Sequence, residues 1–237
     1  MVVEICSYTL SLGHKAVGSQ LLRTAVSGRT TTLEARALFQ GVFGQQSLTQ
    51  TSQLSSNFES LRFSEEEDGK EGKRLFEVVF DAKSGLVKAT RRTPSHTEHA
   101  ETPYLRPYSD PLGLLHRLRS SVHEGTNGEA NAPQRVPLLG KDVVIERLGE
   151  VEVETAFGPR RAVGFALYPG PGYVYVDAQA PHAPLRMVQP TQHGLLEAFL
   201  TRLVQEDGTL NARPGAEPRP AKRRRRGGRK RRRVEPG

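Results

Sequence analysis

The densest chemical signal in the chain is a basic segment close to its C-terminus. Ten Lys and Arg residues fall within twelve positions, in two blocks of five about Gly227 and Gly228: Lys222, Arg223, Arg224, Arg225, Arg226, Arg229, Lys230, Arg231, Arg232 and Arg233. Arginine carries a permanently charged, planar fork that binds phosphate through two hydrogen bonds. The segment therefore predicts an arm that binds nucleic acid, DNA or RNA, electrostatically and without sequence specificity.

The rest of the chain is almost neutral. Of the 34 Lys and Arg residues, 24 lie outside the arm, against 26 Asp and Glu residues, which leaves a formal net charge of −2. Like charges as dense as those of the arm repel one another and cannot be buried. We therefore expect a single β domain over residues 1–205 and a disordered basic tail over residues 206–237.

Other partners for the arm remain open. Anionic lipid head groups attract basic residues by about 1 kcal/mol each near a membrane surface, but no apolar anchor adjoins the arm. A solubilising tail without a dedicated partner is a second alternative. Arg outnumbers Lys by 26 to 8, which is typical of a GC-rich bacterial genome and argues against a nuclear-localisation signal. We expect a cytoplasmic bacterial protein, associated with the nucleoid or the ribosome through the arm.

No catalytic, metal or cofactor motif in the sequence predicts a site. His96 and His99 could present two imidazoles to a metal on a helix, but Pro94 and Pro103 indicate a loop, and no third ligand follows at a suitable spacing. Cys6 falls on the apolar side of a predicted strand, which favours a small buried hydrophobe over a nucleophile. We expect a protein without enzymatic activity, metal or cofactor.

His14, His116 and His182 lie far apart in the sequence, and no nucleophile motif joins them.

Two further patterns allow a functional and a structural interpretation. Tyr168, Tyr173 and Tyr175 could stack on nucleobases, but tyrosine is also common in strands for packing reasons. The acidic residues 65–68 could dock the basic arm within the molecule, but exposed ion pairs contribute only about 0–1 kcal/mol. The structural interpretation is favoured in both cases, with residues 65–70 as a solvated hairpin tip.

Short alternating segments predict a meander of about ten antiparallel strands. Polar turns separate them at 13–15, 27–29, 81–85, 149, 158–159 and 169–172. The proline-rich stretch 91–110 predicts a crossover loop, and 124–133 predicts a second polar loop. Between them, Asp110 is placed to cap a short helix with Pro111 at its first position, and Leu112, Leu115 and Leu118 share one face.

A second helix is expected over residues 192–205, where Leu195, Leu196, Phe199, Leu200 and Leu203 follow the helical i, i+3, i+4 spacing. The predicted fold is therefore mainly β: a strongly curved antiparallel sheet, as a half-barrel or partly closed barrel, with a short mid-chain helix and a C-terminal covering helix.

Composition limits the cellular context. Cys6 is the single cysteine and cannot form an intramolecular disulfide. Residues 1–12 lack the pattern of a signal peptide, and no run approaches the 18 apolar residues of a transmembrane helix.

Several short motifs together resemble the bacterial domain-of-unknown-function family 3108 over roughly residues 5–205. They are Gly13-His14-Lys15-Ala16-Val17-Gly18 after a first strand, Asp110-Pro111-Leu112 leading to Leu118-Arg119, Leu139-Gly140-Lys141, and Pro184-Leu185-Arg186-Met187. The resemblance implies an antiparallel β half-barrel or barrel, typically in exported, envelope-associated proteins, without catalytic residues to carry over. Independently of the resemblance, the predicted fold allows an alternative function: a carrier or sensor whose half-barrel concavity holds an apolar or lipid-like ligand, with the arm as an incidental membrane or nucleic-acid anchor.

Overall fold

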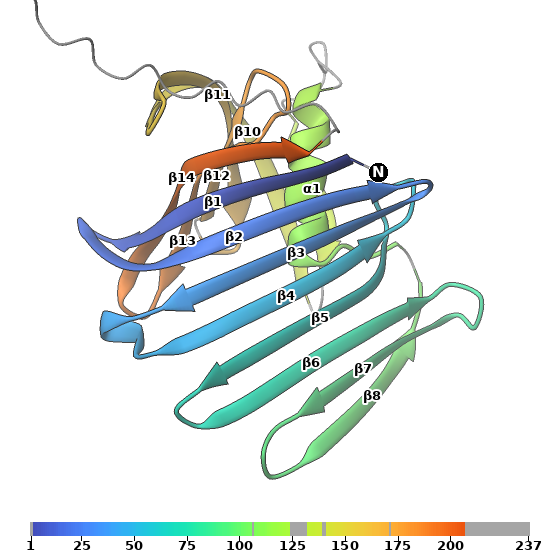
Figure 1. Ribbon diagram of the computed structural model, residues 1–237. Helices are drawn as coiled ribbons and strands as arrows, with labels where there is room; N and C mark the ends of the chain where they lie inside the picture. Colours follow the sequence, from blue (N-terminus) through green and yellow to red (C-terminus); the bar gives the residue numbers. More distant parts are fainter. Residues whose placement is uncertain (1, 106, 124–131, 139–140, 171, 207–237) are drawn as a thin grey trace, which may run out of the picture.

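The computed structural model describes residues 2–105, 107–123, 132–138, 141–170 and 172–206. These residues form one fourteen-stranded antiparallel sheet with one α-helix against its inner face (Figure 1). The strands are β1 (Val2–Leu12), β2 (Lys15–Ser27), β3 (Thr30–Phe39), β4 (Gln46–Leu54), β5 (Ser60–Gly69), β6 (Gly72–Asp81), β7 (Leu86–Arg92), β8 (Thr97–Pro103), β9 (Gln134–Leu138), β10 (Lys141–Thr155), β11 (Gly158–Tyr168), β12 (Gly172–Asp177), β13 (Pro184–Thr191) and β14 (Gly194–Glu206). The helices are α1 (Pro111–His123) and a short 3-10 helix, η1 (Gly41–Phe43).

The sheet consists of two meanders that meet at its centre. Strands β1 to β8 follow one another to one edge, strands β14 to β9 run in reverse order to the other edge, and β1 pairs with β14 between them. The chain crosses from edge strand β8 to edge strand β9 through α1. The sheet is strongly curved and not closed, which confirms the half-barrel predicted from the alternating sequence pattern.

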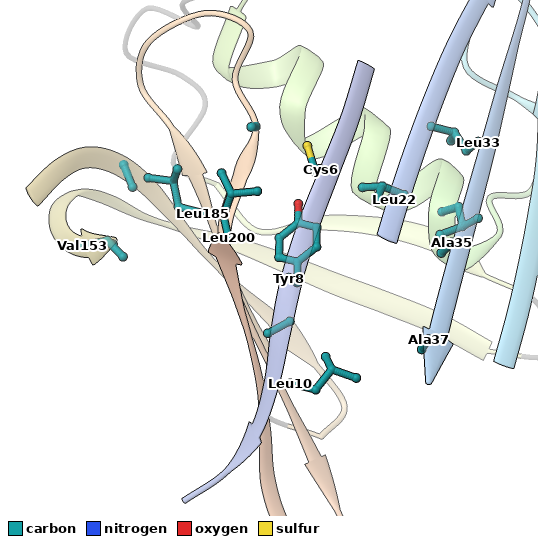
Figure 2. Close-up of a cluster of buried hydrophobic side chains, with 14 of the residues drawn as sticks. Cys6, Tyr8, Leu10, Leu22, Leu33, Ala35, Ala37, Val153, Leu185 and Leu200 are labelled. Atoms are coloured by element: carbon teal, nitrogen blue, oxygen red, sulfur yellow. The ribbon is translucent and has the colours of Figure 1, made fainter. Parts of the chain in front are cut away.

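Most of the core lies between α1 and the inner face of the sheet. Inward residues of β1 alternate with outward ones and are almost fully buried, with Cys6 at 0% and Tyr8 and Leu10 at 2% exposure. Figure 2 shows these side chains along β1, beside Leu22 of β2 and Leu200 of β14. A second cluster packs the other side of α1 against β9 to β12. The helix therefore joins the two meanders through a shared apolar interior.

Strands β5 to β8 continue the sheet beyond the helix (Figure 1). Their inner face carries a smaller cluster of Phe63, Val78, Phe80 and Val87, against which Tyr108 packs. The edge strand β8 is exposed along its whole length, and its glutamates and terminal Pro103 discourage pairing with another chain.

The predicted C-terminal helix is wrong, because residues 194–206 form strand β14. Leu196, Ala198 and Leu200 alternate with outward residues, so the segment satisfies a period of two as well as a helical stripe. Its partners decide between the two periods. As a strand it pairs with β1 on one side and β13 on the other, whereas as a helix it would leave both as unpaired edges.

Three other boundaries differ from those predicted. The stretch 91–110 contains strand β8 and is not wholly a loop, since its residues 97–103 complete the ladder with β7. Gly149 is a bulge within one long strand, β10, and not a hairpin turn; its φ of 89° lets the strand bend while pairing with β11 continues. Residues 65–68 belong to β5, and the turn follows Gly69.

Strands β9 and β13 were not predicted individually, because both are short or interrupted by proline. Most of the predicted loop 124–133, and the proposed tail 206–237 after its first residue, lie outside the described residues.

Candidate functional site

Helix α1 begins where the sequence predicted it. Asp110 Oδ1 accepts hydrogen bonds from the backbone N–H groups of Leu112 (2.9 Å) and Gly113 (2.8 Å), which caps the helix, and Pro111 is its first residue. The other carboxylate oxygen, Oδ2, accepts hydrogen bonds from the hydroxyls of Ser52 and Ser60, both at 2.6 Å. One buried carboxylate therefore fixes the start of α1 to β4 and β5.

Arg119 fixes the second half of the helix. Its guanidinium lies within 2.7 Å of the Glu4 carboxylate on β1 and donates to the backbone carbonyls of Pro181 (3.0 Å) and His182 (2.9 Å). Both charged side chains are less than a tenth exposed. A further contact at 3.4 Å reaches the hydroxyl of Thr24 on β2. Arg119 thus ties α1 to both meanders, and its pairing with Glu4 has no local sequence signal because 115 residues separate the partners.

A cavity of about 480 Å³ lies between α1 and the inner face of the sheet. The helix contributes four leucines to its wall, Leu112, Leu114, Leu115 and Leu118. The remaining apolar wall comes from both meanders: Leu10, Leu138, Val143, Leu167, Val174, Met187, Val188, Leu196 and Ala198, with Pro111, Pro169, Gly170, Gly172 and Pro190. The cavity is therefore an apolar chamber, and the predicted leucine face of α1 forms one side of it.

The cavity reaches the surface at one end of the half-barrel. The ends of strands β9 and β10, β11 and β12, and β13 and β14 lie together at one end of the sheet, and Pro111, the first residue of α1, lines the cavity with residues from these strands. Wall residues next to these turns, Lys141, Gly170 and Pro190, are exposed. The chamber thus has a rim at which a ligand could enter without the sheet opening.

Five described wall residues are polar: Gln20, Gln50, Lys141, Tyr173 and Gln189. The Gln50 side-chain amide donates to Glu65 at 2.6 Å, so one of its two N–H donors is already used. The described wall contains no Asp, Glu, His, Cys or Ser residue.

Cys6 is buried as predicted. Burial, together with the nearby Glu4 carboxylate, raises the pKa of its thiol to about 12, and Sγ lies 3.6 Å from Glu4 Oε1. Burial likewise raises the pKa of Tyr8 well above its usual range. Both groups stay neutral at physiological pH, which suits a packing role.

His116 lies on α1, and its ring packs edge-on against Phe58 at 5.0 Å between centroids. Burial, reinforced by the positive charge of Arg119, lowers the pKa of His116 to about 4. The imidazole is therefore neutral near pH 7. Among the described residues its buried Nδ1 has no hydrogen-bond partner.

The remaining histidine candidates do not converge. His96 lies in the turn before β8 and His99 on β8, and both are exposed. His14 lies in the exposed β1–β2 turn, and His182 packs beside His123 at the far end of α1. No group of three or more His, Cys, Asp and Glu side chains in the described part of the chain is placed to hold a metal ion.

The three tyrosines and the acidic residues of β5 lie in different surroundings. Tyr175 lies below the guanidinium of Arg186, 5.8 Å from the ring centroid, whereas Tyr173 lines the cavity. Tyr168 is exposed at the end of β11. Across the β5–β6 hairpin, Glu66 pairs with Lys73 at 2.8 Å, so this carboxylate is already matched by a cation.

The ten predicted nucleic-acid-binding residues of the arm, from Lys222 to Arg233, lie outside the described residues.

A second surface hollow, of about 820 Å³, lies beside η1 and is lined largely by polar residues such as Gln40, Gln45 and Asp68. In the part of the chain that the structure covers, no helix has the length and apolar character to cross a bilayer.

No protein-family model matches the chain, and no curated protein matches it. Among solved structures, it is similar to a β-barrel-like protein of the domain of unknown function DUF1849 from Brucella abortus, with 11% sequence identity and a TM-score of 0.59. The match covers 87% of this chain and 99% of that one. The β-barrel-like fold implied by the resemblance to family 3108 is thus supported, while membership of that family is not confirmed. The chain shares its fold with a protein domain of unknown function.

Proposed function

We propose that the protein is a non-enzymatic binding protein whose half-barrel holds an apolar, lipid-like ligand. The observation that carries the proposal is the chamber of about 480 Å³ between α1 and the sheet, walled by leucine, valine and methionine. Small-molecule sites usually enclose roughly 300–1,000 Å³ and are mostly apolar, with a few polar groups that orient the ligand. The chamber has this size and this composition.

The packing of protein interiors favours interpreting the chamber as a ligand site and not as a loosely packed part of the core. Protein interiors pack as densely as organic crystals, and a contiguous apolar surface left open to solvent commonly marks a binding site. The neighbouring core, with Cys6 and Ala162 at 0% exposure, packs closely. A chamber retained beside such a core, and open at one rim, is more readily explained as a binding site than as a packing defect.

The proposal is tested with N-phenyl-naphthylamine, an uncharged dye that fluoresces in apolar surroundings. The full-length protein is expected to bind it saturably. The Ala198→Leu variant adds a side chain to the chamber wall and is expected to weaken binding by about tenfold or more. Ala100→Leu, on the exposed edge strand β8, is the matched control and should bind as the wild type does.

Absence of saturable binding to the wild type, or equal binding by wild type and Ala198→Leu at unchanged thermal stability, would contradict the proposal. Organic extraction of the purified protein provides an independent check, because a natural occupant should be recovered from it in stoichiometric amount.

A second proposed function concerns the arm and rests on its composition. Ten basic residues within twelve positions can release several counterions from a polynucleotide, so the arm is proposed to hold the protein on DNA or RNA in the cytoplasm. With six to eight phosphate contacts on duplex DNA, the log affinity should fall with log salt at a slope of about −5 to −7.

A gel shift over a salt series, comparing the intact chain with a version ending at Gly208, tests this second function. Loss of binding on truncation is expected. If the truncated chain keeps the affinity and the slope, the arm is not the binding element. Binding to anionic vesicles in preference to nucleic acid would point to the membrane surface as its partner.

A further inference from the structure

The charges around the chamber are distributed unevenly. Lys141 is the one charged residue among the described residues of the wall. It begins β10, directly after the β9–β10 connection, and is exposed at the rim. No ion pair within the described residues includes Lys141, unlike Arg186, which pairs with Glu197 at 2.6 Å. The ammonium group of Lys141 therefore lies at the rim of an apolar chamber, and no ion-pair partner is found for it among the described residues.

Negative charge lies on the opposite wall. On the β4 side, the wall residue Gln50 donates a hydrogen bond to the carboxylate of Glu65. Strands β4 and β10 are separated by seven intervening strands of the curved sheet, so they stand on opposite sides of α1. An anionic group would be repelled from the β4 side and attracted to the β10 side of the same chamber.

The start of α1 does not supply a competing anion site. Its first free backbone N–H groups are already bound by the carboxylate of Asp110, which also offsets the positive end of the helix dipole. Lys141 is thus the group at the rim that can select a ligand by charge.

We infer that the chamber takes a single-chain amphiphile with an anionic head group, of the fatty-acid class, with its chain between α1 and the sheet and its head group at Lys141. This inference rests on the proposed apolar-ligand function and adds the ligand's charge and orientation to it. The chain would be held by the apolar wall, and a carboxylate would accept hydrogen bonds from the ammonium of Lys141, in a charge-assisted contact that a neutral head group cannot match.

The test compares lauric acid with lauryl alcohol as displacers of N-phenyl-naphthylamine from the full-length protein, below the concentrations at which either aggregates. The two ligands share a chain and differ in head-group charge. Because the ammonium is exposed and screened, the acid is expected to displace the dye at about three- to tenfold lower concentration than the alcohol. In Lys141→Gln this preference should vanish, while the affinity for the alcohol should be unchanged.

Lys83→Gln serves as the control, since Lys83 lies in the exposed β6–β7 turn and not on the chamber wall. This variant should keep the wild-type preference. Lauryl phosphate is tested as a third displacer. A stronger preference for phosphate than for carboxylate would identify a phosphorylated lipid, and not a free fatty acid, as the source of the anionic head group.

The outcomes separate the two proposals. Failure of the dye to bind would overturn the apolar-ligand function itself. Dye binding with equal displacement by acid and alcohol would overturn the anionic-amphiphile inference and leave the apolar-ligand function standing. A preference for the acid that survives Lys141→Gln would overturn the role of Lys141.

Discussion

Arg119 on α1 lies 2.7 Å from Glu4 on β1, and both side chains are less than a tenth exposed. This ion pair crosses the interior between the helix and the strand at which the two meanders meet. The same helix forms one wall of the chamber through its leucines. The energetics of the ion pair follow from burial: each charge is tolerated because the other is present.

Removing one partner of this pair should therefore be costly. Arg119→Met leaves the Glu4 carboxylate buried without its cation and is expected to lower the free energy of unfolding by about 3–5 kcal/mol. Urea unfolding followed by circular dichroism measures the loss. The double variant Glu4→Met/Arg119→Met should lose much less than the sum of the single variants, because no unpaired charge remains. Additive losses would show that the two side chains do not interact.

The carboxylate of Asp110 should be the second most sensitive point of the helix. Asp110→Ala removes the cap of α1 and leaves the hydroxyls of Ser52 and Ser60 without their acceptor. We expect a loss of about 2–4 kcal/mol, of which about 1 kcal/mol is the cap alone. Asp110→Asn, which keeps one oxygen acceptor, should recover part of it. The same unfolding assay applies, and equal stability of wild type and Asp110→Ala would contradict the assignment.

Stability should depend on pH through His116. Its pKa is about 4 in the folded protein and 6.5 ordinarily, so between these values the unfolded chain binds the proton more readily. The contribution is fully present above pH 6.5 and is lost as the pH falls toward 4, to a total of about 3 kcal/mol.

His116→Phe keeps an aromatic ring next to Phe58 and removes the titrating group. Its unfolding free energy should therefore fall less steeply than that of the wild type between pH 6.5 and 4. Unfolding measured at several pH values gives both profiles, and parallel profiles would exclude His116 as the source of the dependence.

Cys6 should be chemically silent in the folded protein. With a thiol pKa of about 12 and 0% exposure, the fraction of thiolate near pH 8 is about a thousandfold smaller than for a free cysteine, and reagents cannot reach it. Iodoacetamide should modify Cys6 only after unfolding in urea. Mass spectrometry of the intact chain follows the modification. Rapid modification of the native protein would contradict the burial of Cys6 on β1.

The strand pattern and the capped helix were predictable because their signals are local. Cys6, Tyr8 and Leu10 alternate with polar residues, and Asp110-Pro111 is a strong start signal for a helix. Strand β14 could not be assigned in this way, since its leucines satisfy two periods at once and only its pairing with β1 and β13 decides between them.

The chamber was not predictable from local pattern for the same reason. Leu115 of α1, Lys141 of β10 and Leu196 of β14 line the same cavity only because the sheet curves around the helix. The ion pair of Glu4 and Arg119 similarly depends on contacts across the whole fold. The leucine face of α1, which forms one side of the chamber, could be predicted from the sequence.

The central claim, an apolar ligand between α1 and the sheet, can be tested most directly with a single tryptophan. The chain contains no Trp, so Tyr173→Trp introduces a lone reporter on the chamber wall, and Phe157→Trp places one in the exposed β10–β11 turn as a control. Dibrominated stearyl alcohol quenches tryptophan on contact. We predict saturable quenching in Tyr173→Trp and none in Phe157→Trp; equal quenching in the two variants, or none in either, would contradict the claim.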